Sequence, residues 1–90
     1  MILWREHALL RMAKRDITVS DVRSVLKTGI VIETFEDSPL PSRLVLGFDT
    51  AGDPIHVLVR ERDDELCIFT AYRPSDELWE ADHRTRKRPQ

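Results

Sequence analysis

The sequence predicts an α+β fold: two N-terminal helices packed on a four-stranded antiparallel meander, followed by a short C-terminal helix. The N-terminal third holds helix formers with apolar side chains three and four positions apart. The middle of the chain alternates apolar and polar residues in short runs separated by turn residues. Connections this short require neighbouring strands to run antiparallel.

The composition is that of one folded domain. The chain has 90 residues, enough for a single hydrophobic core, and residues 84–90 are expected to form a flexible basic tail. No apolar run is long enough to span a membrane, and the single Cys67 has no partner for an internal disulfide. We therefore expect a cytoplasmic protein that does not associate with membranes. The net charge of −2 excludes a uniformly basic nucleic-acid binder, but a local basic groove remains possible.

A first helix is predicted from Leu3 to Lys14 or Arg15, a stretch without Gly or Pro. Beside its apolar stripe runs a second stripe with one imidazole and three cations: His7, Arg11, Lys14 and Arg15. This stripe is either a solvated edge or part of a binding site. A second helix is predicted to begin at Thr18, with a capping box to Asp21, and to end at Gly29 in a left-handed conformation.

Four strands are predicted at residues 30–36, 43–48, 54–61 and 66–72, with a stiff proline-bearing loop at residues 37–42. After Pro74, Ser75 is expected to cap a short helix anchored by Leu78 and Trp79. The strand at residues 54–61 is the central one. One of its faces is wholly apolar, whereas His56 and Arg60 interrupt the other, so this second face is expected to be partly open to something polar.

The chemistry-bearing residues favour a reaction without a cofactor. The histidines and the lone cysteine lack the short spacing of metal-ligand pairs, and there is no Gly-rich phosphate loop. The remaining His, Arg, Thr and Tyr side chains suit RNA cleavage without a metal. That reaction needs a base for the 2′-hydroxyl proton, cations for the charge that develops on phosphorus, and an acid for the leaving oxygen. Many proteins that are not enzymes contain the same residue types.

A set of spaced motifs resembles the domain-of-unknown-function 4258 family, over residues 7–86. The motifs are His7-Ala8-x-x-Arg11-Met12, Pro41-Ser42-Arg43-Leu44-Val45-Leu46-Gly47, Ile55-His56-Val57 and Thr70-Ala71-Tyr72-Arg73-Pro74. That family in turn resembles the BrnT-like toxins of the RelE and barnase-like ribonuclease superfamily. The resemblance implies helices packed on an antiparallel sheet and a bacterial toxin–antitoxin setting. At Thr70–Pro74 the chain departs from the Ser-Ala-Arg type of motif that ends the BrnT-like toxins.

The resemblance implies five catalytic candidates: His7, Arg11, His56, Thr70 and Tyr72. Cations expected to bind the substrate are Lys14, Arg15, Arg43 and Arg73. Each candidate also has a structural explanation. In this explanation His56 is a buried, backbone-bonded imidazole, Tyr72 is a packing residue, and Arg43 is the anchor of the proline loop. Cys67 is expected in the core.

The strand register decides whether His56 and Thr70 share a face. A regular hairpin would place His56 opposite Ala71 and Thr70 on the other face, whereas an odd loop or a bulge would bring His56 and Thr70 together. The sequence leaves both alternatives open.

The resulting expectation is a metal-independent endoribonuclease, the toxin of a type II toxin–antitoxin system, with an antitoxin protein as partner. Its mechanism requires His7, Arg11 and His56 to line one cleft. The alternative is a catalytically silent domain of the same fold that binds a protein or a nucleic acid.

Overall fold

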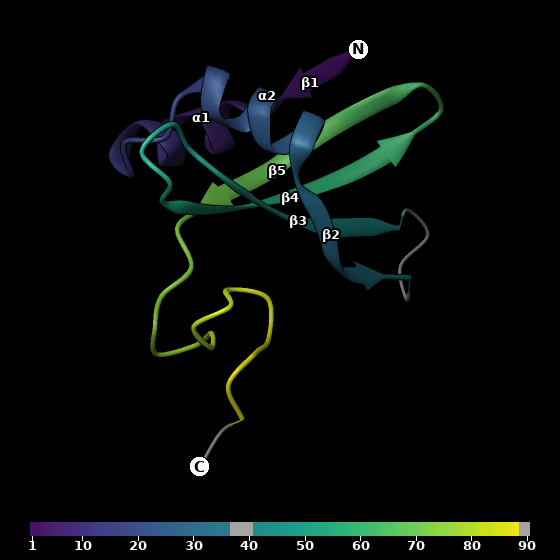
Figure 1. The fold of residues 1–90 in the computed structure, drawn as a ribbon. Coiled ribbons are helices and arrows are strands. Elements are labelled where there is room, and N and C mark those ends of the chain that lie inside the picture. Colours follow the sequence, from purple (N-terminus) through teal and green to yellow (C-terminus); the bar gives the residue numbers. More distant parts are fainter. Residues whose placement is uncertain (37–40, 89–90) are drawn as a thin grey trace.

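The computed structural model describes residues 1–36 and 41–88. Along the chain, the helices and strands are β1 (Ile2–Trp4), α1 (Glu6–Lys14), α2 (Val19–Thr28), β2 (Ile30–Phe35), β3 (Ser42–Phe48), β4 (Pro54–Arg62) and β5 (Glu65–Tyr72). The strands form one sheet in the order β1-β5-β4-β3-β2. Figure 1 shows the two helices on one side of this sheet and the C-terminal segment on the other.

The predicted α+β class and the two helices are confirmed, but the sheet has five strands and is mixed. The strands β2 to β5 pair antiparallel, whereas β1 lies parallel to β5, with Leu3 opposite Cys67. The first helix therefore begins at Glu6 and not at Leu3. Three residues are too few to show a strand period, and pairing with β5 outweighs the helix propensity of Leu3 and Trp4.

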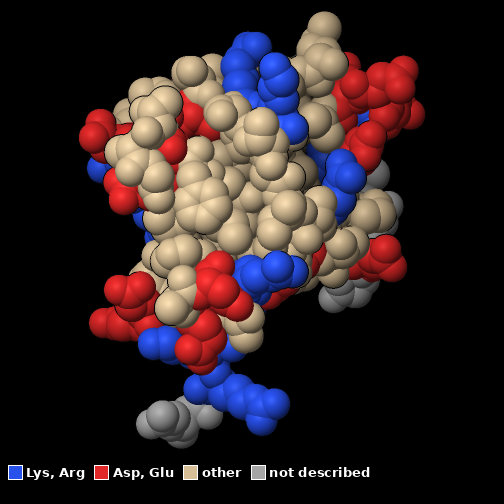
Figure 2. All heavy atoms as spheres, viewed as in Figure 1, with Lys and Arg blue, Asp and Glu red and all other residues tan. Residues whose placement is uncertain are grey.

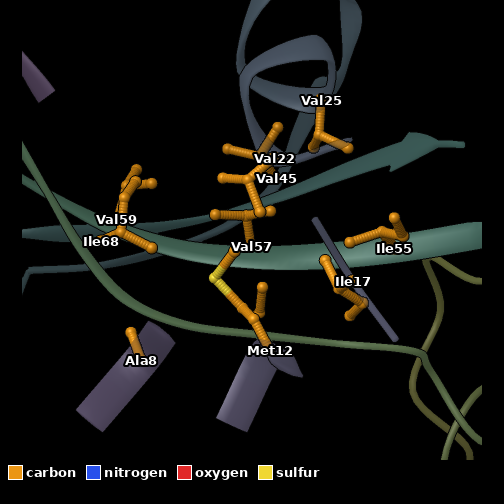
Figure 3. Close-up of a cluster of buried hydrophobic side chains, with 11 residues drawn as sticks. Ala8, Met12, Ile17, Val22, Val25, Val45, Ile55, Val57, Val59 and Ile68 are labelled. Carbon is orange, nitrogen blue, oxygen red and sulfur yellow. The ribbon is translucent and has the colours of Figure 1, made fainter. Parts of the chain in front are cut away.

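The core lies between the helices and the sheet (Figure 3). It contains Ala8 and Met12 from α1, Val22 and Val25 from α2, and strand residues whose side chains point toward the helices: Val45, Ile55, Val57, Val59, Ile68 and Ala71. Burying each Val or Ile removes apolar surface worth about 1.5–3 kcal/mol. The wholly apolar face predicted for the central strand is thus the face that packs on the helices.

The predicted start of α2 at Thr18 and its predicted end at Gly29 are confirmed, but the predicted left-handed conformation of Gly29 is wrong. Thr18 accepts a hydrogen bond from the amide of Asp21, whose carboxylate accepts one from the amide of Thr18, which completes the capping box. Gly29 has φ −76° and ψ 175°, an extended conformation and not a left-handed one. Glycine is required there by close packing, because a Cβ atom would lie 2.5 Å from the carbonyl oxygens of Val25 and Leu46.

A β-bulge settles the register of the β4–β5 hairpin. The turn at Asp63 and Asp64 is a regular two-residue turn, and Val59 lies opposite Ile68. Phe69 is then an extra residue on β5, so that Leu58 lies opposite Thr70 and His56 opposite Tyr72. The bulge therefore places His56, Thr70 and Tyr72 on the same face of the sheet, away from the helices.

The predicted C-terminal helix is absent from the described residues. The amide of Trp79 bonds to the carbonyl of Ser75, but the chain then turns back, and Trp79 pairs with Arg86 in an isolated β-bridge. We call residues 75–88 the C-terminal strap. Residues 84–90 were expected to have little to bury, yet Arg86 forms an ion pair with Glu33 of β2. Residues 89–90 and most of the expected proline-bearing loop, residues 37–40, lie outside the described residues.

Candidate functional site

The candidate site residues lie mainly on the sheet face away from the helices, which has two parts. In the closed half, His56 and Tyr72 lie with Leu44 and Leu46 under the C-terminal strap. In the open half, Arg60 and Phe69 lie with Leu3, Arg5 and Cys67 around a pocket. Both halves share β4 and β5, because residues two apart on a strand point to the same face.

The closed half holds the imidazole of His56 with both nitrogen atoms bonded. Nε2 lies 2.6 Å from the carbonyl oxygen of His83, which can only accept, so Nε2 carries the proton. Nδ1 of the neutral ring is then the acceptor, and the Tyr72 hydroxyl donates to it over 3.1 Å. His56 is fully buried.

Aromatic packing completes the closed half. The indole of Trp79 meets the His56 ring edge to face, with 4.4 Å between the ring centroids, and Trp79 is 3% exposed. Burial lowers the pKa of His56 below its usual 6.5, which favours the neutral ring. Burial also raises the pKa of the Tyr72 hydroxyl, which keeps it a donor. In this arrangement His56 cannot exchange a proton with a substrate.

The open half is a pocket of about 320 Å³ lined by three arginines around an aromatic ring. The guanidinium carbons of Arg5 and Arg60 lie 4.7 Å and 4.4 Å from the centroid of Phe69, and Arg62 and Glu65 also line the pocket. The buried Nε of Arg60 has no hydrogen-bond partner among the described residues. The ring thus holds two like charges close together, an arrangement that an anion would stabilise.

His7 lies next to this pocket. An adjoining hollow of about 340 Å³ is lined by His7, Glu6, Arg5 and Phe69, so the two hollows share the Arg5 and Phe69 side chains. His7 is exposed at the start of α1. The accessible imidazole of the first helix therefore neighbours the arginines of the sheet, whereas the imidazole of β4 is sealed.

The arginines of the pocket differ from others on the molecule. Arg43, Arg73 and Arg86 each form an ion pair, with Glu61, Asp49 and Glu33 respectively. Within residues 1–36 and 41–88, no ion pair engages the three arginines of the pocket. In the view of Figure 2, acidic and basic side chains are interspersed around an uncharged centre, with no continuous basic surface. The open half is therefore a local concentration of cations.

The structure brings only some of the predicted site residues together. His56 contacts Tyr72, and Arg15 donates to the Ala71 carbonyl and, over 3.4 Å, to Thr70. The cleft expected to hold both His7 and His56 is not formed, because His56 lies sealed beneath the strap. The remaining predicted cations lie on exposed helix surface or in ion pairs: Arg11, Lys14, Arg43 and Arg73.

Sequence reasoning placed Arg60 on the partly polar face of the central strand without including it among the site residues, and it missed Arg5, Arg62 and Phe69. The alternation of β4 marks Arg60 and Arg62 as facing away from the core, so this signal was present. The bulge that turns Phe69 toward them leaves no trace in the sequence. Cys67, expected in the core, is half-buried and lines the pocket, because the register of β5 places it opposite Arg60.

Among the described residues, no group of three His, Cys, Asp or Glu side chains is arranged to hold a metal ion. No helix in the described part of the chain is both long and apolar enough to cross a membrane.

Comparison with known proteins gives one match. The family model described as a domain of unknown function (DUF4258) matches residues 4–73. This range includes both helices, the strands β2 to β5 and the pocket residues other than Leu3, but only the last residue of β1 and none of the C-terminal strap. No curated protein and no solved structure matches the chain.

Proposed function

The chain belongs to the DUF4258 family, and we propose that it is a metal-independent endoribonuclease that binds single-stranded RNA at the open half of the sheet. The observation that carries the proposal is the arrangement of Arg5 and Arg60 on the ring of Phe69, beside the exposed His7. The BrnT-like and RelE-like toxins are the expected functional relatives, by resemblance of the motifs.

Binding follows from the geometry of the guanidinium groups. Each group packs on the Phe69 ring, which fixes its position at little cost in side-chain entropy and leaves N–H donors to bind an anion. A phosphodiester oxygen pair matches the donor fork of arginine. A bound phosphate would also reduce the repulsion between Arg5 and Arg60. The apolar side chains of Leu3 and Phe69 offer a surface for a nucleobase.

Cleavage is proposed to use the ribose 2′-hydroxyl as the nucleophile. His7 takes the 2′-hydroxyl proton, the 2′-oxygen bonds to phosphorus, and the bond from phosphorus to the 5′-oxygen breaks. A proton from water or from the His7 imidazolium neutralises the leaving oxygen. The products are a 2′,3′-cyclic phosphate and a 5′-hydroxyl end. The arginines stabilise the charge that develops on the phosphorane oxygens, the larger contribution in such reactions.

The test is incubation of the purified chain with single-stranded RNA in EDTA, followed by analysis of the product ends. We expect cleavage with cyclic phosphate ends, and its loss in His7→Ala. RNA binding, measured by anisotropy with 2′-O-methyl RNA, should weaken about ten-fold in Arg60→Ala. Arg23→Ala on the exposed face of α2 is the matched control and should bind normally. Equal binding by both arginine variants would contradict the site.

A second function is favoured by the sealing of His56, which leaves one accessible imidazole near the pocket. With a single acid–base group, the chain would bind RNA or a protein without cleaving RNA. Intact RNA in the same assay, together with binding that depends on Arg60, would favour this alternative.

The proposed partner is an antitoxin protein, in a type II toxin–antitoxin pair that acts in the cytoplasm. Charge complementarity favours an acidic segment that covers the Arg5–Arg60 pocket. Expression of the chain alone should arrest bacterial growth, and coexpression of the adjacent reading frame should restore it. Growth arrest that persists in Arg60→Ala would contradict the role of the pocket.

A further inference from the structure

The C-terminal strap fills the closed half with the indole of Trp79, which meets the imidazole of His56 edge to face. The guanidinium of Arg86 lies 4.7 Å from the indole on the strap itself. Aromatic side chains are groups with which proteins hold an unstacked nucleobase, and the sheet itself supplies two of them to the slot, His56 and Tyr72. The slot that holds Trp79 therefore has the chemistry of a nucleobase site.

The floor of this slot carries polar groups that the strap satisfies. The His83 carbonyl accepts the Nε2 proton of His56, and the Tyr72 hydroxyl donates to Nδ1 of the same ring. If the strap moved away, Nε2–H would be free to donate to a nucleobase acceptor. The bond to His83 is thus one that a base could replace, at no loss of hydrogen bonding.

The slot and the open half form one continuous face. His56, Leu58 and Arg60 alternate along β4 and point to the same side, and Thr70 lies opposite Leu58. The four steps along the strand from His56 to Arg60 span about 13 Å. A short oligonucleotide whose phosphate binds Arg60 can therefore reach the slot.

The strap lies outside the part of the chain that matches the family model. Residues 4–73, which match the model, include His56 and Tyr72 on the floor of the slot, whereas Trp79 and Arg86 lie outside the match.

We propose that the Trp79 slot is a nucleobase subsite for single-stranded RNA, and that the strap closes it with Trp79 until RNA displaces the indole. This inference depends on the proposed RNA binding at the open half. Exchange of the indole for a base keeps the slot filled and the floor buried.

The positive charge of the strap explains how RNA could displace the strap from the slot. Arg86 binds both carboxylate oxygens of Glu33, over 2.7 Å and 2.9 Å, and its neighbours Arg84, Lys87 and Arg88 are exposed cations. Figure 2 shows basic side chains gathered at the end of the chain. A polyanion on the adjacent face competes with Glu33 for these cations, which favours release of the strap.

The first test uses the fluorescence of Trp79. The chain has two tryptophans, so Trp4→Phe leaves Trp79 as the only one. Addition of a short 2′-O-methyl oligoribonucleotide should shift the emission of Trp79 to longer wavelength as the indole enters water. Anisotropy of the labelled oligonucleotide measures binding in the same sample. Binding without an emission shift overturns the inference and leaves the proposed function intact, whereas the absence of binding overturns both.

The second test compares two arginines of the strap. Arg86→Ala removes the ion pair with Glu33, whereas Arg84→Ala removes an equal charge that no described ion pair engages. We expect Arg86→Ala to bind the oligonucleotide up to about five-fold more tightly than Arg84→Ala, the factor for a favourable exposed ion pair. Equal or weaker binding by Arg86→Ala overturns the inference.

A third test probes the slot alone with adenosine monophosphate. In Arg86→Ala, entry of the nucleotide should change the NMR signals of the His56 ring. Unchanged signals at a saturating concentration of adenosine monophosphate overturn the assignment of the slot.

Discussion

The two halves of the sheet face are built on the same two strands, yet one buries its polar groups and the other exposes them. In the closed half, His56 has two hydrogen bonds and no exposed surface. In the open half, Arg60 has a buried Nε without a described partner. The difference arises from the cover, because the strap reaches the first half and not the second. A neutral imidazole can be satisfied within the protein, whereas clustered guanidinium groups need an external anion.

The largest effect on stability is expected from removing the Trp79 side chain, with which the strap covers the closed half. Trp79→Ala should lower the free energy of unfolding by about 3 kcal/mol, the low end for a buried tryptophan, because the slot can partly collapse. Urea denaturation measures this. The neighbouring Leu78→Ala is the control, since Leu78 is 64% exposed and its loss should cost less than about 0.5 kcal/mol. Similar effects of the two substitutions would mean that the closed half is not tightly packed.

The second largest effect is expected from pH, because the closed half buries a neutral imidazole and the open half does not. Because burial lowers the pKa of His56 in the folded protein, the unfolded chain binds its proton first as the pH falls. Stability should be fully present above pH 6.5 and should decrease below it by up to about 1.4 kcal/mol per pH unit. The decrease ends at the folded pKa of His56. Unfolding measured between pH 7 and 5 should show this slope in the wild type and not in His56→Gln; a slope unchanged by the substitution would assign it to another group.

A smaller effect on stability is expected from the ion pair between Arg86 of the strap and Glu33 of β2. Arg86→Ala should reduce the free energy of unfolding by about 1 kcal/mol or less, because the ion pair is exposed on the arginine side. High salt should reduce the difference between Arg86→Ala and the wild type, since surface ion pairs are screened. Thermal denaturation at low and high ionic strength tests this, with Arg84→Ala as the matched control. A salt-independent loss would indicate that packing on Trp79 is the main contribution of Arg86.

The smallest effect on stability is expected in the open half. Arg60→Ala loses a contact with Phe69 worth about 0.5–1 kcal/mol but also removes repulsion from Arg5 and Arg62. The two changes oppose each other, so the free energy of unfolding should change by less than about 0.5 kcal/mol. A chemical denaturation curve close to that of the wild type would fit a residue kept for binding. A loss as large as that of Trp79→Ala would place Arg60 among the structural residues.

Local patterns predicted much of the fold and part of the site. The Thr18 capping box, the apolar face of β4 and the outward position of Arg60 depend on residues close in sequence, so the sequence revealed them. The burial of His56 depends on the carbonyl of His83, 27 residues later, and on the C-terminal strap. The sequence of the strap shows no hydrophobic period from which its position could be predicted. The strand β1 was missed for a similar reason, because its three residues acquire their conformation only by pairing with β5.

The extra residue at Phe69 decides on which side of the sheet the end of β5 presents its side chains. If Phe69 instead paired regularly opposite Leu58, the alternation of the strand would turn Tyr72 toward Met12 and the helices and Ala71 toward the opposite face. Deletion of Phe69 would remove the bulge and restore regular pairing, with Thr70, Ala71 and Tyr72 on their present faces. The fold should therefore tolerate this deletion, whereas the open half would lose the ring on which Arg5 and Arg60 pack.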